Sequence, residues 1–489
     1  MCLKALAPLW RIGGVAVSRG FAKGIIGKGG ILLLSVAARI RRQGWLRSVY
    51  RHVPQGLRNR LSLALAASTR RRVRFVRTSA WDRIPEIIPV LSQSSLALRP
   101  ICGTTPGVNI FAYFRGQFGL GESARLYTRA LIDSGYPVAL QDIDLQLPHN
   151  LGDRSLDEYL CSRMPYTIHL VFVNPDHLDE AIHKIGRAKL AGGYLIACWF
   201  WELQDIPRDW LPALDLVDEI MVASKFVEDA FRKVTDKPIL RVPPPLSSVL
   251  GSDLTRADFG LAPDKFVFLY MFDFNSSLHR KNPFAVIDAF RRAFEPGRPD
   301  VQLLVKSSNG HRYPDKLLQL LKAAGADARV LVRDDIIDRS HAHALQHCAD
   351  AYVSLHRAEG FGLGLAECMA MGKPVIATGW SGNLEFMTAE NSLLVDYRLV
   401  AVGEGEYPHL SGAVWADADL DDAARAMRRL ADNRFFAAEL GARAASDVRN
   451  ILSPLVAAEA IALRLSEIAV NAQRPPFSTL SDKATTGVN

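Results

Sequence analysis

Short apolar runs with the length of β-strands alternate with helix-like segments through most of this chain after residue 100. Alternation of this kind, with short turns between the segments, is typical of a parallel sheet whose two faces are covered by helices. A proline run at 243–245, followed by a linker-like stretch, divides the alternation into two series. The sequence therefore predicts an α/β protein with two doubly wound, Rossmann-like domains. The strand-like runs are 108–114, 136–143, 167–173, 192–201 and 218–224 in the first series, and 265–274, 301–308, 327–335, 350–358 and 373–379 in the second.

Changes in composition and in the strand–helix pattern divide the chain into four predicted segments. Residues 1–100 form a basic N-terminal extension, residues 101–260 form the first Rossmann-like domain, and residues 261–472 form the second, with closing helices at its end. Residues 473–489 are polar and contain proline, and we expect them to be disordered. A length of 489 residues is ample for two such domains, each with a sizeable core.

The formal net charge of +8 comes entirely from the start of the chain. Residues 1–81 contain 17 Lys or Arg and no Asp or Glu, whereas residues 82–489 contain 42 basic and 51 acidic residues. A mildly acidic body disfavours a nucleic-acid-binding protein, because such proteins carry basic surface on the binding domain. The six cysteines show neither the C-x-x-C spacing of zinc sites nor a disulfide framework, which favours a reduced, cytoplasmic protein.

The basic N-terminal segment interleaves apolar and cationic side chains. Its longest apolar stretch, GGILLLSVAARI, is too short to span a bilayer. One interpretation is that residues 1–80 bind an anionic membrane surface, where each basic side chain adds about 1 kcal/mol. The protein would then be cytoplasmic and peripheral on the inner face of the cell membrane. The alternatives are a disordered arm, a misassigned start codon, or a basic helix that covers the acidic body.

The most informative stretch is HRAEGFGLGLAECMAMGKPVIATGWSGNLEF, residues 356–386. Its layout is strand, glycine loop, helix, strand and loop, and open parallel sheets bind ligands at the carboxyl ends of their strands. Glycines in EGFGLG let backbone amides approach an anion, and the following helix adds its positive dipole end. A diphosphate suits that loop. The two acids that flank it, Glu359 and Glu367, suit hydroxyl donors, one on a ribose and one on a sugar.

This stretch is similar to the signature of the retaining family 4 (group 1) glycosyltransferases, which have the GT-B fold. That signature is E-x7-E around an EGFG-type loop, then a helix of small residues, a G-x-P-V-I-A-T strand, and a loop with G-N or G-x-E. The resemblance covers about residues 105–470, more loosely in the first half. The matching residues are Glu359, Gly360, Phe361, Gly362, Glu367, Gly372, Lys373, Pro374, Val375, Ile376, Ala377 and Thr378.

The resemblance implies a GT-B enzyme whose two Rossmann-like domains face a cleft. It implies transfer of a hexosyl unit, with retention of anomeric configuration, from a nucleoside-diphosphate sugar to a hydroxyl of a glycan or lipid-linked acceptor. The nucleotide sugar is a substrate, so no cofactor and no metal are expected. Cell-surface polysaccharide or glycolipid biosynthesis is the implied setting, and by family frequency the sugar would be mannose.

The resemblance also assigns roles to individual residues. Glu367 would bind the ribose hydroxyls of the nucleotide, and Glu359 would contact the donor sugar beside its anomeric centre. The amides of Phe361, Gly362 and Leu363, next to Gly360, would meet the sugar and the β-phosphate. The loop of Ser381, Gly382 and Asn383 would edge the donor pocket, unless it is an ordinary turn.

A departing diphosphate needs cations, because metal-free catalysis must stabilise its charge electrostatically. The family places an Arg and then a Lys after the first strand of the second domain. Lys281 matches the Lys, but the Arg position falls on Asn275. Arg280 or Lys306 could supply the missing charge. For each of these cations the alternative is an ordinary surface charge.

The first domain contains RGQFGLGESARL, whose GLGESA string has the form of a dinucleotide fingerprint, with Asp142 twenty-one residues after Gly121. A dehydrogenase is therefore one interpretation. Four residues separate the strand from Gly119, which weakens the coupling between strand and turn that the fingerprint needs. We favour the interpretation in which Gly119 and Gly121 present amides to the donor phosphates across the cleft. Asp142 and Asp144 also form a D-x-D string, to which we assign no metal.

The segment CWFWELQDIP falls where many family members carry a histidine that touches the donor sugar or acceptor, but it has none. Trp201 and Glu202, with Trp199, could form a wall for the acceptor, because aromatic faces pack on sugar C–H groups. They could equally be core residues. A binding or scaffold protein on an inactive glycosyltransferase fold is the remaining alternative, since both the usual Arg and this histidine are absent.

Overall fold

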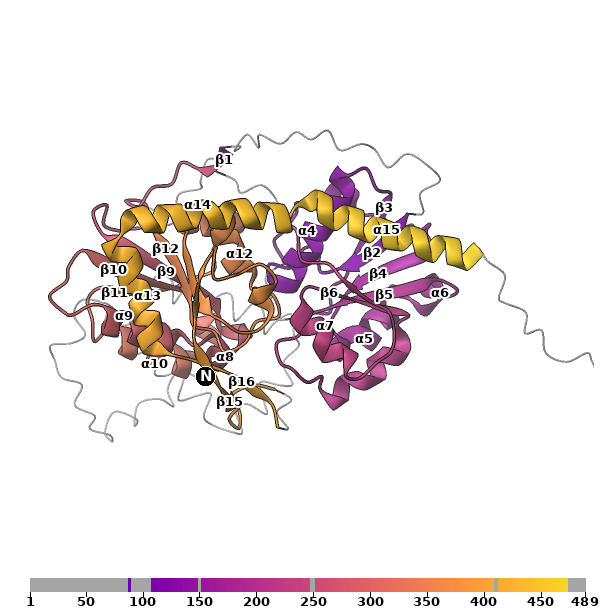
Figure 1. Ribbon diagram of the computed structural model, residues 1–489. Coiled ribbons are helices and arrows are strands. Elements are labelled where there is room, and N and C mark those ends of the chain that lie inside the picture. The colour runs from indigo at the N-terminus through magenta and orange to yellow at the C-terminus, as the bar shows by residue number, and fades with distance from the viewer. Residues whose placement is uncertain (1–86, 89–106, 148–150, 247–250, 409–411, 474–489) are drawn as a thin grey trace, which may run out of the picture.

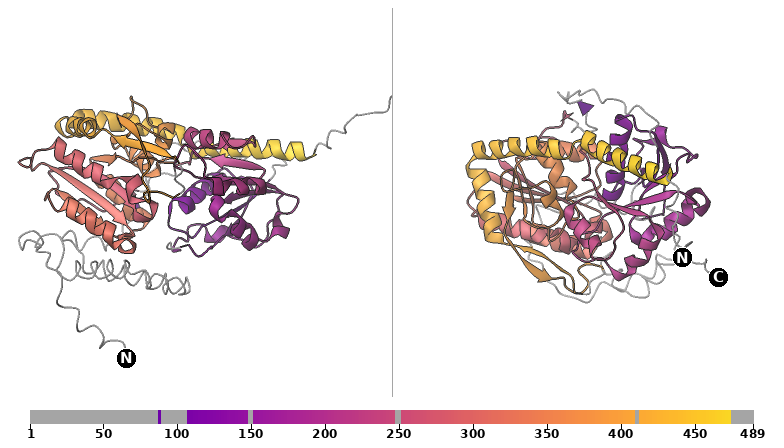
Figure 2. Two further views of the ribbon diagram at one scale, coloured as in Figure 1. Left: turned by 90° about the horizontal axis from the view of Figure 1, so that it is seen from below. Right: turned by 45° about the vertical axis from the view of Figure 1, so that its right-hand side comes forward.

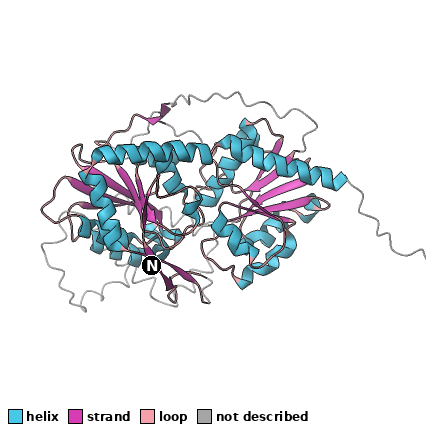
Figure 3. Ribbon diagram, viewed as in Figure 1, coloured by secondary structure: helices cyan, strands magenta, loops and turns pink. Residues whose placement is uncertain are grey.

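The computed structural model describes residues 87–88, 107–147, 151–246, 251–408 and 412–473. In this part of the chain lie two six-stranded sheets, each parallel throughout and each covered by helices on both faces (Figures 1 and 3). The prediction of two doubly wound, Rossmann-like domains is confirmed. The predicted membrane-binding segment and the predicted disordered tail lie outside the described residues.

The N-terminal domain has the strand order β3-β2-β4-β5-β6-β7. β2 is buried on both faces, which is why it reads as a continuous apolar run rather than an alternating one. Ile110 faces the core under α4, and Phe111 faces the core on the α5 and α7 side. The elements are β2 (Val108–Ala112), α4 (Gly119–Asp133), β3 (Val138–Asp142), β4 (Ile168–Phe172), α5 (Pro175–Ile185), α6 (Arg187–Leu190), β5 (Tyr194–Trp199), β6 (Glu219–Val222), α7 (Lys225–Arg232) and β7 (Ile239–Arg241).

The C-terminal domain has the strand order β11-β10-β9-β12-β13-β14. The chain reverses its direction across the sheet between β9 and β12, so the loops that follow these two strands diverge and open a crevice at their carboxyl ends. Its strands are β9 (Phe266–Asp273), β10 (Val301–Ser308), β11 (Val330–Asp334), β12 (Ala351–Ser354), β13 (Val375–Thr378) and β14 (Leu393–Val395). Its helices are α8 (Leu278–Lys281), α9 (Pro283–Ala293), α10 (Pro314–Ala324), α11 (Arg339–Cys348), α12 (Leu363–Ala370), α13 (Leu420–Asp432) and α14 (Arg434–Ile451).

The last helix returns to the N-terminal domain. α14 runs over the C-terminal domain and α15 (Pro454–Gln473) continues across the N-terminal domain (Figures 1 and 2). Ile461 and Leu465 of α15 are buried in the same cluster as Tyr127 of α4. Within the described residues, the chain therefore crosses between the domains twice, and α15 is part of the core of the first domain.

Two smaller elements complete the fold. β1 (Ile87–Ile88) pairs antiparallel with β8 (Gly251–Ser252), and β15 (Tyr397–Ala401) pairs antiparallel with β16 (Val414–Ala418). Among the residues that the structure describes, no helix combines the length and the apolar character that a bilayer crossing requires.

Candidate active site

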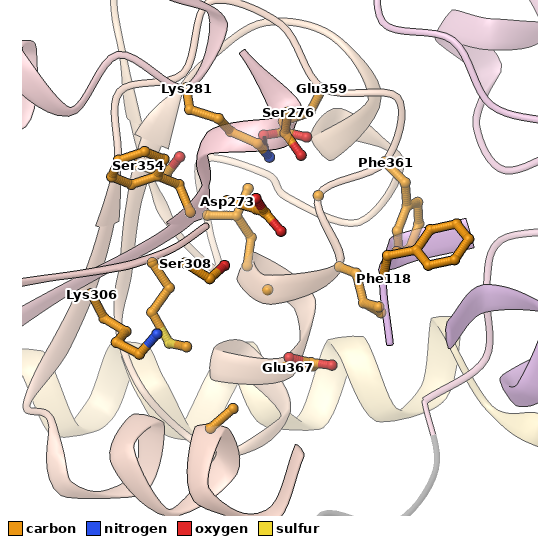
Figure 4. A pocket seen from close by; sticks show the side chains of 18 of the residues that line it. Phe118, Asp273, Ser276, Lys281, Lys306, Ser308, Ser354, Glu359, Phe361 and Glu367 are labelled. Atoms are coloured by element: carbon orange, nitrogen blue, oxygen red, sulfur yellow. Dashed lines mark hydrogen bonds and ion pairs between the residues drawn. The ribbon is translucent and has the colours of Figure 1, made fainter. Parts of the chain in front are cut away.

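A cavity of about 500 Å³ lies between the two domains, at the carboxyl ends of β9, β10 and β12. The start of α4 and the segment after β5 form its N-terminal-domain wall, and the loops after β9 and β12 form the opposite wall. Figure 4 shows Glu359 and Glu367 on opposite sides of the cavity. The topological switch point of the C-terminal sheet thus opens toward the other domain.

The glycine loop, residues 359–364, joins β12 to α12 along this cavity. Gly362 is the N-cap residue of α12 with φ at +97°, a conformation that glycine adopts without strain. A Cβ on Gly360 would lie 2.7 Å from the carbonyl oxygen of Trp201 in the other domain, so only glycine permits this approach. The first amides of a helix have no partner within it. Leu363 and Gly364, where α12 begins, line the cavity and offer such groups to an anion.

Glu359 at the start of this loop is compensated by two cations from α8, the short helix that follows β9. Its carboxylate pairs with the ammonium of Lys281 and lies 3.2 Å from Nη1 of Arg280. Burial alone would raise the pKa of Glu359, but the charges of Lys281 and Arg280 outweigh it and lower that pKa to about 2. Burial lowers the pKa of Lys281, and Glu359 opposes this effect. Glu359 is therefore an ionised, oriented acceptor at neutral pH.

Arg280 connects this carboxylate to the other domain. The residue is only 4% exposed, and its Nη1 donates a hydrogen bond of 2.8 Å to the carbonyl oxygen of Ala358. Its Nη2 lies 3.4 Å from Oε1 of Glu202, whose Oε2 accepts a hydrogen bond of 2.6 Å from the hydroxyl of Tyr407. Burial opposes the charge of Arg280, but Glu202 and Glu359 together raise its pKa.

Glu367 lies on α12, on the other side of the cavity. Its Oε2 accepts a hydrogen bond of 3.1 Å from Gln346, and its Oε1 lies 3.0 Å from Nη2 of Arg339. Burial alone would raise the pKa of Glu367, but Arg339 and His343 lower it to about 2. Each carboxylate oxygen can accept two hydrogen bonds. Glu367 can therefore accept further bonds from a ligand while these partners hold it.

The comparisons with known proteins agree with this geometry. Residues 266–433, which run from β9 to the end of the C-terminal domain's α13, match the family model described as "Glycosyl transferases group 1". The C-terminal domain is therefore similar to the domain of group 1 glycosyltransferases. A stretch of 180 residues is 27% identical to trehalose synthase of Rubrobacter xylanophilus, and it covers 36% of this chain and 38% of the length of that relative.

Solved structures of low sequence identity share the arrangement of both domains. HepE of Anabaena, in complex with UDP and glucose, is 17% identical with a TM-score of 0.52, over 74% of this chain and 100% of that chain. Sucrose-phosphate synthase from Thermosynechococcus elongatus is 17% identical with a TM-score of 0.52, over 75% and 98% of the two chains. The two domains together therefore have the GT-B fold, as predicted.

The structure brings most of the predicted site residues to one cavity. Both predicted carboxylates, the predicted cations and the glycine loop line it together with two residues of the N-terminal domain. The predicted residues on the cavity are Gly119, Glu202, Arg280, Lys281, Lys306, Glu359, Gly360, Phe361, Gly362, Leu363 and Glu367. Of the predicted set, the residues that do not line this cavity are Gly121, Trp201, Ser381, Gly382 and Asn383.

Ser381, Gly382 and Asn383 do not line the cavity. Ser381 and Gly382 instead form hydrogen bonds with the backbone at the start of the glycine loop. Oγ of Ser381 accepts a hydrogen bond of 2.9 Å from the amide of Glu359, and the amide of Gly382 donates one of 2.8 Å to the carbonyl of the same residue. A Cβ on Gly382 would overlap the carbonyl oxygen of Gly360. Asn383 is fully buried and bonds to the ring of His356 at 3.1 Å. In this structure they support the backbone of the glycine loop, and their contact with a donor stays a prediction.

Two predicted site residues of the N-terminal domain, Gly121 and Trp201, also lie outside the lining of the cavity. Gly121 lies in the first turn of α4, and a Cβ there would come within 2.6 Å of the carbonyl oxygen of Gly116, so close packing explains this glycine. Trp201 is 3% exposed and packs on Trp210 with ring centroids 4.6 Å apart, while Trp199 is fully buried. Both tryptophans are core residues, and only Glu202 of the proposed acceptor wall faces the cavity.

The two predicted substitutes for the family's arginine have different surroundings. The ammonium of Lys306 donates hydrogen bonds of 2.7 and 2.6 Å to the carbonyls of Ser307 and Asp335, and burial lowers its pKa. Arg280 instead contacts Glu359 directly. Asn275 accepts a hydrogen bond from Tyr313 and is not a lining residue, whereas its neighbour Ser276 is.

The acids of the dinucleotide interpretation lie elsewhere. Asp142 accepts a hydrogen bond of 3.1 Å from the amide of Arg115, and Asp144 accepts one of 2.7 Å from the amide of Gln146. Neither lines the cavity. In the described part of the chain, no three His, Cys, Asp or Glu side chains gather as a metal site would require.

Several cavity residues were not predicted from the sequence. Asp273, Ser276, Ser308 and Ser354 lie at the strand ends or just after them, where polar side chains following an apolar run were the available signal. In the sequence, Arg339 lies 33 residues after Lys306, the nearest predicted site residue before it, and no motif around Arg339 indicates a site. Its role becomes visible only through its two carboxylate partners.

Proposed function

We propose that this protein transfers a hexosyl unit from a nucleoside-diphosphate sugar to a hydroxyl of a glycan or lipid-linked acceptor, with retention of anomeric configuration. The observation that carries the proposal is the placement of Glu359 and Glu367 on two sides of one interdomain cavity, with the glycine loop between them. Two ionised carboxylates suit two groups of hydroxyls, and the amides between them suit a diphosphate.

The donor would lie along the glycine loop with its ribose at Glu367 and its sugar at Glu359. Lys281 and Arg280 are the cations nearest the sugar side, and a bound diphosphate would draw on their charge. Glu202 reaches this side from the N-terminal domain through its contact with Arg280, so we assign it to the acceptor. HepE was solved with UDP and glucose, which supports uridine as the first base to test.

The setting that we propose is cell-surface polysaccharide or glycolipid biosynthesis, with a mannosyl donor as a second sugar to test. The 17 basic residues among the first 81 support contact with an anionic membrane surface, where the enzyme would act on a lipid-linked acceptor. We propose that the reaction needs no metal ion, because Arg280, Lys281 and the α12 amides can meet the charge of the leaving group.

Isosteric variants of the two carboxylates test the proposal. Glu367→Gln should weaken binding of the nucleoside diphosphate by about 10- to 100-fold, the value of hydrogen bonds to a charged group. Glu359→Gln should leave that affinity within a few-fold but lower turnover by about 100-fold, because the sugar loses its orientation. Calorimetry with UDP and GDP, and release of nucleotide from a panel of UDP- and GDP-sugars, measure the two effects.

A matched control is Glu439→Gln on α14, an exposed carboxylate paired with Arg443, which should change neither quantity. Wild-type-like binding and turnover in both cavity variants would refute the site. NMR of the product with a simple alcohol acceptor tests retention, and an inverted anomer would overturn that part.

A further inference from the structure

A chain of ion pairs crosses the cleft beside Glu367. Arg339, the first residue of α11, lies between two carboxylates from different domains. Its Nη1 is 2.8 Å from Oε1 of Glu122 on α4, and its Nη2 is 3.0 Å from Oε1 of Glu367 on α12. The side chains of Glu122 and Glu367 are only 14% and 12% exposed. One guanidinium thus joins the N-terminal domain to a carboxylate of the cavity.

We propose that Arg339 is a positioning residue that orients Glu367 and couples occupation of the nucleotide site to closure of the two domains. The proposal rests on the proposed function, because it takes a nucleoside diphosphate as the ligand of Glu367. Arg339 itself touches neither the sugar nor the reacting atoms.

The C-terminal end of the bridge is held so that it can still bind. Arg339 and Gln346 each contact one oxygen of the Glu367 carboxylate, which fixes its plane. Ribose hydroxyls can use the remaining lone pairs only in that fixed orientation. Loss of Arg339 would free the carboxylate to rotate and would leave it buried without its strongest partner.

The N-terminal end of the bridge is also rigid. Oε2 of Glu122 lies 2.7 Å from Arg125, whose Nη1 donates hydrogen bonds of 2.8 Å to the carbonyls of Phe114 and Gly116. These carbonyls belong to the turn that leads from β2 into α4. Movement at Arg339 is therefore transmitted to the segment of the N-terminal domain that lines the cavity.

The location of Arg339 favours a specific role over a chance surface pair. A cation in the first turn of a helix opposes the helix dipole, so Arg339 gains nothing from α11 itself. Its guanidinium uses two separate nitrogens for two carboxylates, which a lysine with a single nitrogen cannot copy. Lys at this position would keep the charge near Glu367 but would lose the bridge.

Variants of the full chain test both parts of the proposal. Arg339→Gln should raise the Kd of UDP or GDP, whichever binds the wild type, by tenfold or more. It should raise the donor KM in parallel and leave kcat within about threefold. Arg339→Lys should restore most of the affinity. Hydrogen exchange of residues 119–125 should become slower in the wild type when nucleotide binds, and should not respond in Arg339→Gln, Arg339→Lys or Glu122→Gln.

Arg298→Gln is the matched control, because Arg298 also bridges two carboxylates, Asp300 and Asp432, and is 31% exposed against 34% for Arg339. It should bind nucleotide and respond in exchange as the wild type does. Equal affinity in Arg339→Gln and the wild type, a loss equal to that of Arg298→Gln, or an exchange response preserved in Arg339→Lys would overturn the proposal.

Failure of the proposed function is distinguishable from failure of this inference. If the wild type binds neither UDP nor GDP, the proposed function is wrong. The Arg339 bridge is then tested by hydrogen exchange of the ligand-free protein. There Arg339→Gln must accelerate exchange of residues 119–125 relative to both the wild type and Arg298→Gln. Unchanged exchange in that comparison refutes the bridge as well.

Discussion

At the scale of the residue, Glu359 is buried and yet ionised because two cations reach it from one short helix, α8. Arg280 also donates a hydrogen bond to the carbonyl of Ala358 and lies near Glu202, so its removal would disturb more than the Glu359 carboxylate. The ammonium of Lys281, by contrast, contacts the Glu359 side chain itself. Lys281 is therefore the better residue with which to test the charge of Glu359, because its removal leaves the frame made by Arg280.

Lys281→Met should raise the pKa of Glu359 from about 2 toward or beyond its ordinary value of 4.5. A carboxyl with a lowered folded-state pKa contributes stability above its unfolded pKa and loses it as the pH falls through the folded one. In the wild type that loss falls between pH 4.5 and about 2. In Lys281→Met this loss should shrink as the folded-state pKa approaches 4.5, and stability should instead rise on acidification if that pKa exceeds 4.5. Thermal unfolding and turnover measured from pH 3 to pH 7 check this.

The control for that experiment is Lys225→Met, which removes an exposed lysine paired with Asp229. Its pH profiles should match those of the wild type. If Lys281→Met gives the same profiles as Lys225→Met, then Lys281 does not set the ionisation of Glu359.

Spacing in the sequence predicted which loops meet, and not which way each side chain points. Glu359 and Glu367 could be placed at one site because strand ends and helix starts in a doubly wound domain share one edge of the sheet. Ser381 and Asn383 follow another strand of the same sheet, yet they turn to the backbone of the glycine loop and to His356. Only the packing of one loop on another decides between these outcomes.

At the scale of the element, the two domains meet through backbone contacts of the glycine loop. Ser224, the N-cap residue of α7 in the N-terminal domain, donates a hydrogen bond of 2.7 Å to the carbonyl of Gly360 and accepts one from the amide of Val227. The glycine loop also lies against the carbonyl of Trp201. α7 and the loop after β5 therefore hold the cavity wall of the opposite domain.

Ser224→Ala should lower both stability and catalytic efficiency. Loss of an N-cap hydroxyl costs about 1 kcal/mol, and loss of the bond to Gly360 should release the loop that carries Glu359. Asp419→Ala is the matched control, because Asp419 caps α13 through the amides of Asp421 and Asp422 and does not line the cavity. Both variants should unfold earlier, but only Ser224→Ala should reduce kcat/KM, by several-fold. Equal kcat/KM in the two would contradict the role of Ser224.

The strands could be predicted more closely than the irregular elements. Buried parallel strands have apolar centres, and the predicted strand 301–308, with Leu303, Leu304 and Val305 at its centre, coincides with β10. The hairpin of β15 and β16 was not predicted. Its apolar residues Tyr397 and Leu399 are exposed, so they do not indicate a buried strand. Tyr407, which lies between these two strands and bonds to Glu202, was missed for the same reason.

At the scale of the whole molecule, α15 is the helix that returns from the C-terminal domain to the first domain. The sequence predicted closing helices at the end of the segment 261–472, but it could not say which sheet such a helix covers. Arg464 of α15 lies 2.8 Å from Oε2 of Glu219, a residue of β6 that is 1% exposed. Tyr194 on the neighbouring strand donates a further bond of 3.0 Å to the same carboxylate. A charge pair in which the carboxylate is buried and the arginine partly exposed thus holds α15 on β6 of the first domain.

Arg464→Met should destabilise the protein by about 3 kcal/mol, because it leaves the buried Glu219 carboxylate without its cation. Adding Glu219→Met should recover part of that loss, since replacing both partners by apolar groups removes the unpaired charge. Glu467→Gln removes the exposed partner of Arg464 and should cost less than about 1 kcal/mol.

Hydrogen exchange of β6 measures how firmly α15 is docked, and turnover at low temperature measures whether the active site is intact. Turnover should be unchanged in all three variants. An Arg464→Met variant no less stable than Glu467→Gln would show that the apolar face of α15, rather than this ion pair, holds the helix in place.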